Sequence, residues 1–222
     1  MSTSYAISAA AIADAFCASL TNSQSSLEPY KHYILSDALP KNVIHDLATL
    51  PFKAPSLEGV SGKRELHNDT RSYFDKDAMA RYPVMDAVAE ALQSHKVTST
   101  IASFCKAEID DTFLRLEYAQ DIDGFWLEPH TDLGVKKFTC LIYLSDDHAD
   151  LGTDIYAAPD QHFGRSPFAP GMAMIFVPGT NTWHGFEKRP IHGVRKSVIL
   201  NYVTHEWRAR EQLSYPDTPV RL

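Results

Sequence analysis

The sequence has few cysteines, no basic cluster and no long apolar run, and each shortage argues against a class of protein. Its three cysteines, Cys17, Cys105 and Cys140, are odd in number and widely spaced, which is unlike a disulfide framework. Lysine and arginine never occur in a run longer than a pair, so no polybasic membrane patch is predicted. The net charge of -7 argues against nucleic-acid binding, because contacts with phosphates require a basic surface.

The beginning of the chain also lacks positive charge. Residues 1–29 contain no lysine or arginine and therefore lack the basic region that opens a secretory signal peptide. No stretch approaches the roughly 20 apolar residues of a membrane-spanning helix. We therefore expect a cytoplasmic protein without a membrane partner. The length of 222 residues and the hydrophobic fraction of 44% suit one domain with a sizeable core.

Helical patterns occupy the first half of the chain and strand patterns the second half. Apolar residues recur at helical spacing in 10–20, in 39–50 after a cap at Ser36 or Asp37, and in 77–92 with an interruption at Pro83. Short apolar or alternating segments separated by glycine and proline turns predict strands. These segments are 112–118, 125–129, 138–144, 153–156, 173–177 and 194–204. We predict an α+β fold, a sandwich or barrel of the jelly-roll type with helices packed outside.

A His-x-Asp triplet is a candidate metal-binding motif, and the sequence contains three of them. The triplets at His67 and at His148 lie in polar loops, which favours solvated surface. His130 and Asp132 instead follow the apolar end of a predicted strand. A spacing of two in extended chain places both side chains on the same side. This pair is therefore the best candidate to hold one face of a metal ion.

A third ligand must come from a distant strand, and His184 is the best candidate. It follows the predicted strand 173–177 and a turn at Pro178 and Gly179. Two imidazoles and one carboxylate on one face of an ion leave three coordination positions open, which is the arrangement of non-haem Fe(II) oxygenases.

The predicted strand 194–204 carries a cation among apolar residues. Arg195 and Ser197 share one face of this strand, and a buried guanidinium needs a partner. Either a structural Asp or Glu or the carboxylate of a ligand meets that need. For a ligand carboxylate, the guanidinium offers a bidentate fork and Ser197 adds a hydroxyl donor.

Taken together, these motifs resemble the Fe(II)/2-oxoglutarate-dependent dioxygenase superfamily, and within it the prolyl-4-hydroxylase-like group. The similarity spans about residues 111 to 204. The matching segments are His130-Thr131-Asp132, 140–144, Gly152-Thr153, 170–176, His184 and Arg195-x-Ser197.

The resemblance implies a double-stranded β-helix and a set of site residues. His130, Asp132 and His184 would bind Fe(II), while Arg195 and Ser197 would bind the distal carboxylate of 2-oxoglutarate. Tyr118 and Tyr143 fall where such enzymes often place a hydroxyl near this cosubstrate, although both also suit an aromatic core. The implied reaction consumes O2 and 2-oxoglutarate, hydroxylates a substrate, and releases succinate and CO2. Prolyl 4-hydroxylases that act on collagen-type substrates usually have lysine at the anchor, so Arg195 argues against a prolyl-peptide substrate.

The predicted organisation is one domain in four segments. Residues 1–29 form an extension with a short helix, 30–110 a helical support region, 111–204 the β-helix core, and 205–222 a tail. The tail is expected to pack on the barrel or on a second subunit, which would make a homodimer. A small-molecule or peptidyl substrate is the expected partner.

Two other functions remain open from the sequence. A cupin-like metal-dependent isomerase would keep the jelly roll but would leave Arg195 and Ser197 without a cosubstrate. A non-catalytic jelly-roll binding protein predicts no tight iron binding, and a His184→Ala change would then affect stability only.

Overall fold

The computed structural model describes residues 8–57, 62, 71–145 and 150–222. The His67 triplet, and His148 of the third triplet, therefore lie outside the described residues. Asp150 is exposed and forms an ion pair with Arg165.

Five α-helices in the described residues carry apolar faces into a shared core. Their bounds are α1 (Ala9–Thr21), α2 (Lys41–Ala48), α3 (Lys76–Arg81), α4 (Pro83–Gln93) and α5 (His95–Cys105). Ser8, Asp75 and Ser94 accept hydrogen bonds from the first turns of α1, α3 and α5, as helix caps do. Within the described part of the chain, no helix is long and apolar enough to cross a membrane.

The strands of the described residues form two antiparallel sheets. The larger sheet has the order β1-β2-β9-β6-β11-β4-β3, and the smaller has the order β5-β10-β7-β8. The strands of the larger sheet are β1 (Gln24–Ser26), β2 (His32–Leu35), β9 (Ala173–Phe176), β6 (Lys136–Tyr143), β11 (Arg195–Val203), β4 (Phe113–Asp121) and β3 (Ser72–Tyr73). Those of the smaller sheet are β5 (Leu127–His130), β10 (His184–Phe186), β7 (Asp154–Ala158) and β8 (Gln161–Arg165).

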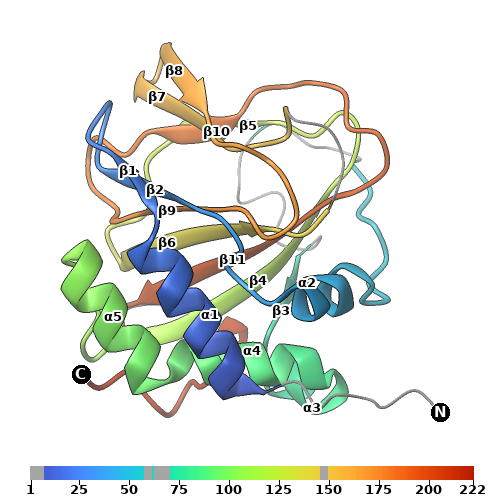
Figure 1. Cartoon of the computed structure of the whole chain (residues 1–222). Helices are drawn as coiled ribbons and strands as arrows, with labels where there is room; N and C mark the ends of the chain where they lie inside the picture. Colours follow the sequence, from blue (N-terminus) through green and yellow to red (C-terminus); the bar gives the residue numbers. More distant parts are fainter. Residues whose placement is uncertain (1–7, 58–61, 63–70, 146–149) are drawn as a thin grey trace.

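The larger sheet separates two hydrophobic clusters. Helices α1, α4 and α5 cover one of its faces, and the smaller sheet lies over the other face (Figure 1). Strand β11 lies between β4 and β6 and alternates between the clusters, with Leu200 on the helical side and Ile199 between the sheets. The period-two pattern that predicted this strand therefore also assigns its faces.

The sheets draw on more of the chain than the predicted core of 111–204. Strands β1, β2 and β3 come from residues 24–73 and form both edges of the larger sheet. Helix α2 begins after Pro40 and is not capped by Ser36 or Asp37, and Asp37 instead has a φ of 53°. Helix α5 and strands β8 and β10 were also not predicted. The two strands are short, and serine, threonine and histidine interrupt the apolar pattern of α5. The C-terminal tail contains a single 3-10 turn, η2 (Arg210–Gln212).

Candidate metal and cosubstrate site

The structure brings His130, Asp132 and His184 together at the edge of the smaller sheet. His130 ends β5, and His184 begins β10 directly opposite it in the antiparallel register. Potential ligand atoms of the three side chains all lie within 4.8 Å of one another. Two strands far apart in sequence therefore place one candidate donor set around one point.

A glycine permits this close approach of the two strands. A Cβ added at Gly185 would lie 2.8 Å from the carbonyl oxygen of Leu127, too close for any side chain to fit there. The glycine that follows His184 therefore lets β10 lie tightly against β5 beside the triad.

Backbone carbonyls orient both imidazoles. The Nδ1 atom of His130 lies 2.9 Å from the carbonyl oxygen of Glu128, and that of His184 lies 2.9 Å from the carbonyl oxygen of Thr182. A carbonyl only accepts, so each Nδ1 carries the proton and each Nε2 has a lone pair available for a metal.

The Asp132 carboxylate is held in place by two donors that sequence reasoning missed. Lys136 Nζ lies 2.5 Å from Oδ1, and the Thr139 hydroxyl lies 2.6 Å from Oδ2. The Thr139 hydroxyl in turn accepts from the Asn201 amide at 2.9 Å. A carboxylate offers about four lone-pair directions, so it can accept hydrogen bonds and bind a metal ion at once. Two oriented imidazoles and one carboxylate fit Fe(II).

The Arg195 side chain is buried and forms an ion pair with Asp121. Its Nη1 donates to Asp121 Oδ2 at 2.6 Å and its Nε donates to the carbonyl oxygen of Leu151 at 2.7 Å. Within the described residues, its Nη2 donates to no acceptor. The Ser197 hydroxyl is buried and likewise has no hydrogen-bond partner in the described part of the chain. Because an unpaired buried hydroxyl costs about 1–3 kcal/mol, both donors fit a bound carboxylate.

One small cavity is lined by two members of the triad and by Arg195. Its walls include Asp132, His184, Arg195 and Asp121, together with Leu141 and Ile199. The cavity measures about 40 Å³, which is close to the space of one water molecule. Binding of a five-carbon dicarboxylate would therefore require wall side chains to move.

A second, wider groove opens on the other side of the triad. It measures about 290 Å³ and shares Leu127, Asp132 and Lys136 with the inner cavity. The C-terminal segment supplies part of its wall through Trp207, Ala209 and Gln212. This wall could not be predicted from periodicity, because the segment is irregular apart from η2.

The two tyrosines lie on opposite faces of the larger sheet. Tyr143 lies between the sheets, with its ring centroid 5.6 Å from the Arg195 guanidinium and its hydroxyl bonded to Thr153 and Ser166. Tyr118 lies in the helical-side cluster, and its hydroxyl donates to the carbonyl oxygen of Leu47 at 2.9 Å. Tyr143 therefore lies beside Arg195, whereas the Tyr118 hydroxyl lies on the helical face of the sheet, away from the cosubstrate anchor.

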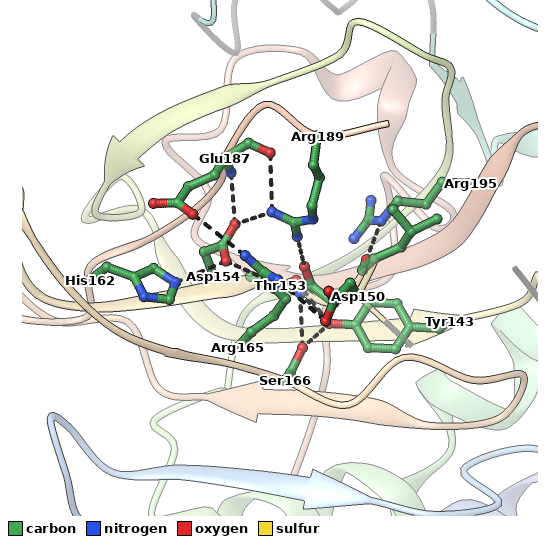
Figure 2. A network of polar contacts seen from close by, with 12 residues as sticks. Tyr143, Asp150, Thr153, Asp154, His162, Arg165, Ser166, Glu187, Arg189 and Arg195 are labelled. Atoms are coloured by element: carbon green, nitrogen blue, oxygen red, sulfur yellow. Dashed lines mark hydrogen bonds and ion pairs between the residues drawn. The ribbon is translucent and has the colours of Figure 1, made fainter. Parts of the chain in front are cut away.

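Asp154, His162 and Glu187 form a second cluster with metal-ligand geometry, but arginines already neutralise it. Figure 2 shows Asp154 between Arg165 and Arg189, which reach its two carboxylate oxygens at 2.7 and 2.6 Å. Burial raises the pKa of Asp154, but hydrogen bonds from Arg189, the Glu187 backbone and Arg165 outweigh burial and hold this pKa below its ordinary value. The cluster therefore reads as a structural ion-pair network that ties β7 to the segment after β10.

Replacing Asp154 with asparagine should destabilise the fold by about 3 kcal/mol, because two guanidiniums lose their buried counter-ion. For a chain of this size, that loss corresponds to a fall in Tm of about 6–12 °C. The stabilisation by Asp154 exists above the pKa of an unfolded aspartate and is lost as pH falls through the lower folded pKa. The difference in Tm between wild type and variant should therefore shrink in acid.

Thermal unfolding measured from neutral pH down into acid tests this prediction. Glu187→Gln is the matched control, because Glu187 is exposed and lies 3.5 Å from Arg165, and exposed pairs contribute about 0–1 kcal/mol. Equal Tm losses in the two variants would contradict the structural role assigned to Asp154.

No protein-family model matches the sequence, and no curated protein matches it at a significant level. Solved structures do match the fold. A prolyl 4-hydroxylase of Phytophthora capsici has 14% identity and a TM-score of 0.59, with 93% of this chain and 68% of that chain covered. A Trichoplax adhaerens prolyl hydroxylase, in complex with a hypoxia inducible factor peptide fragment, has 13% identity and a TM-score of 0.58, with coverages of 89% and 91%.

A third match is HygX from Streptomyces hygroscopicus, whose structure has nickel and 2-oxoglutarate bound. It has 12% identity and a TM-score of 0.50, with 79% of this chain and 82% of that chain covered. At such low identity, these likenesses establish the architecture and leave the chemistry to the residues. The chain has the mixed helix and antiparallel-sheet fold of the prolyl 4-hydroxylases and other Fe(II)/2-oxoglutarate oxygenases.

Proposed function

We propose that this protein is an Fe(II)/2-oxoglutarate-dependent dioxygenase that hydroxylates a small-molecule or peptidyl substrate and releases succinate and CO2. The two sheets would form the double-stranded β-helix of such enzymes. One observation carries the proposal: Asp132 and His184 of the His130, Asp132 and His184 donor set line the same cavity as the buried Arg195 side chain.

Each of these side chains has a defined task. The Nε2 atoms of His130 and His184, with the Asp132 carboxylate, would hold Fe(II) and leave coordination positions open. When bound, Fe(II) and 2-oxoglutarate supply the activation of O2 that drives oxidative decarboxylation and hydroxylation. Arg195 and Ser197 would fix the distal carboxylate of 2-oxoglutarate and so set its orientation. Leu141, Ile199 and Phe186 line the cavity and would limit the access of water.

The substrate would approach from the wider groove, because His130 and Asp132 form part of its wall. Its 290 Å³ lies at the lower end of the range for small-molecule sites. A short peptide segment could also lie across the groove, since the Trichoplax adhaerens prolyl hydroxylase was solved in complex with a peptide fragment.

The function is tested by incubating the purified protein with Fe(II), ascorbate, 2-oxoglutarate and O2 and measuring succinate. We expect slow succinate release without added substrate, and no release in the presence of a chelator. The isomerase alternative predicts metal binding with no succinate. The non-catalytic alternative predicts neither succinate nor tight metal binding. Either of these last two results would contradict the proposal.

A further inference from the structure

We propose that Arg71 is a second anchor for the cosubstrate, so that two guanidiniums bind its distal carboxylate together. This inference rests on the proposed function and assigns a specificity residue within the same site.

A single carboxylate brings the two guanidiniums to the same place. Asp121 ends β4 and lies opposite Arg195 in the register of β4 and β11. Its Oδ2 accepts from Arg195 at 2.6 Å, and its Oδ1 lies 2.9 Å from Arg71 Nη2. Arg71 directly precedes β3, which pairs with β4. A ligand carboxylate at Arg195 would therefore lie within a few ångströms of Arg71.

The charges of this group do not balance. Arg71 also lies 3.4 Å from Glu117, but Glu117 is more tightly paired with Arg115, at 2.7 Å. Among the described residues, three guanidiniums (Arg71, Arg115 and Arg195) thus share two carboxylates (Glu117 and Asp121), which leaves one positive charge in excess. A buried excess charge is costly unless a counter-ion joins it. One ligand carboxylate supplies that counter-ion.

Arg71 also has a hydrogen-bond donor to offer. Its side chain is 9% exposed, and Nη1 is buried without a hydrogen-bond partner in the described part of the chain. The same side chain lines the cavity that contains Asp132, His184 and Arg195. A guanidinium donates N–H groups to carboxylate oxygens. Arg71 Nη1 and Arg195 Nη2 can therefore both donate to one bound carboxylate.

The consequence is selectivity for a 2-oxo acid with a second carboxylate. A monocarboxylate with the same carbon chain would chelate the metal but would leave both guanidiniums without an added partner. 2-Oxopentanoate is such a probe, since it has the five-carbon chain of 2-oxoglutarate without the distal carboxylate.

The test is a calorimetric titration of the Mn(II)-loaded protein with 2-oxoglutarate and with 2-oxopentanoate. We expect Arg71→Gln to weaken 2-oxoglutarate binding by about tenfold or more, because charge-assisted hydrogen bonds are lost. Its affinity for 2-oxopentanoate and for Mn(II) should equal that of wild type. The control is Arg81→Gln, which changes an exposed arginine at the end of α3 and should change none of these affinities.

Three results would overturn the inference. If Arg71→Gln weakens both 2-oxo acids equally, Arg71 only maintains the shape of the cavity. If it weakens neither, Arg71 does not contact the ligand. If wild-type protein with bound Mn(II) fails to bind 2-oxoglutarate, the proposed function fails with it. Should Arg71→Gln not fold, Arg71→Lys applies the same comparison with the charge kept, and it should lose less affinity, again for 2-oxoglutarate alone.

Discussion

Replacing His184 with alanine is expected to reduce succinate formation to background and to weaken metal binding by more than about a hundredfold. Groups that only orient metal ligands are already worth about 10–100-fold in affinity, and His184 would be a ligand itself. Its Nε2 carries the lone pair of the imidazole because Nδ1 donates to the Thr182 carbonyl oxygen at 2.9 Å. Titration with Fe(II) without oxygen, followed by a succinate assay, measures both effects.

The matched control is His45→Ala, which removes an exposed histidine on α2 and should leave both quantities unchanged. Thermal unfolding of the metal-free proteins checks that His184→Ala still folds. A folded His184→Ala protein with wild-type metal affinity would contradict the assignment of this residue as a ligand.

Replacing Arg195 with alanine is expected to raise the KM for 2-oxoglutarate by about a hundredfold, as loss of a charge-assisted contact of about 3 kcal/mol would do. Metal affinity should stay within about twofold of wild type, because Arg195 begins β11, whereas Asn201, opposite the Thr139 that holds Asp132, lies near the other end of this strand. The measurement is succinate formation as a function of 2-oxoglutarate concentration, with metal affinity measured separately.

Arg195→Lys provides the comparison, because lysine keeps the charge but lacks the planar fork, and an intermediate KM is expected. The unfolding temperature of each variant must be measured as well, since the change to alanine removes one partner of buried Asp121. An equal loss of metal affinity and of 2-oxoglutarate affinity in Arg195→Ala would show that the metal site and the carboxylate anchor are not separate sites.

The candidate ligands were predictable from the sequence because their pattern is local. The period of two in extended chain places His130 and Asp132 on one side, and His184 follows a strand and a turn. The same alternation along 112–118 also located Tyr118, which shares its face with Leu114 and Leu116. Sharing a strand face with two leucines favours a place for Tyr118 in the hydrophobic core, and its hydrogen bond to the Leu47 carbonyl agrees with that place.

The partners of the site residues were not predictable, because they depend on pairing between distant segments. Asp121 meets Arg195 only through the register of β4 with β11, and Arg71 reaches Asp121 only because β3 forms the edge of the same sheet. Lys136 is four residues after Asp132, but no helix joins them, so the familiar spacing of helical ion pairs did not apply. The sequence determines which side chains each strand carries, and the register between paired strands determines which of these side chains come into contact.

The most direct test of the central claim is an optical titration of the wild-type protein with Fe(II) and 2-oxoglutarate in the absence of oxygen. If His130, Asp132 and His184 hold iron while 2-oxoglutarate chelates it, a visible charge-transfer absorption should appear. It should saturate at one iron per chain. The band should be absent in His184→Ala and should require far more 2-oxoglutarate in Arg195→Ala. A wild-type protein that gives no band, or a His184→Ala protein that gives the same band, would contradict the account.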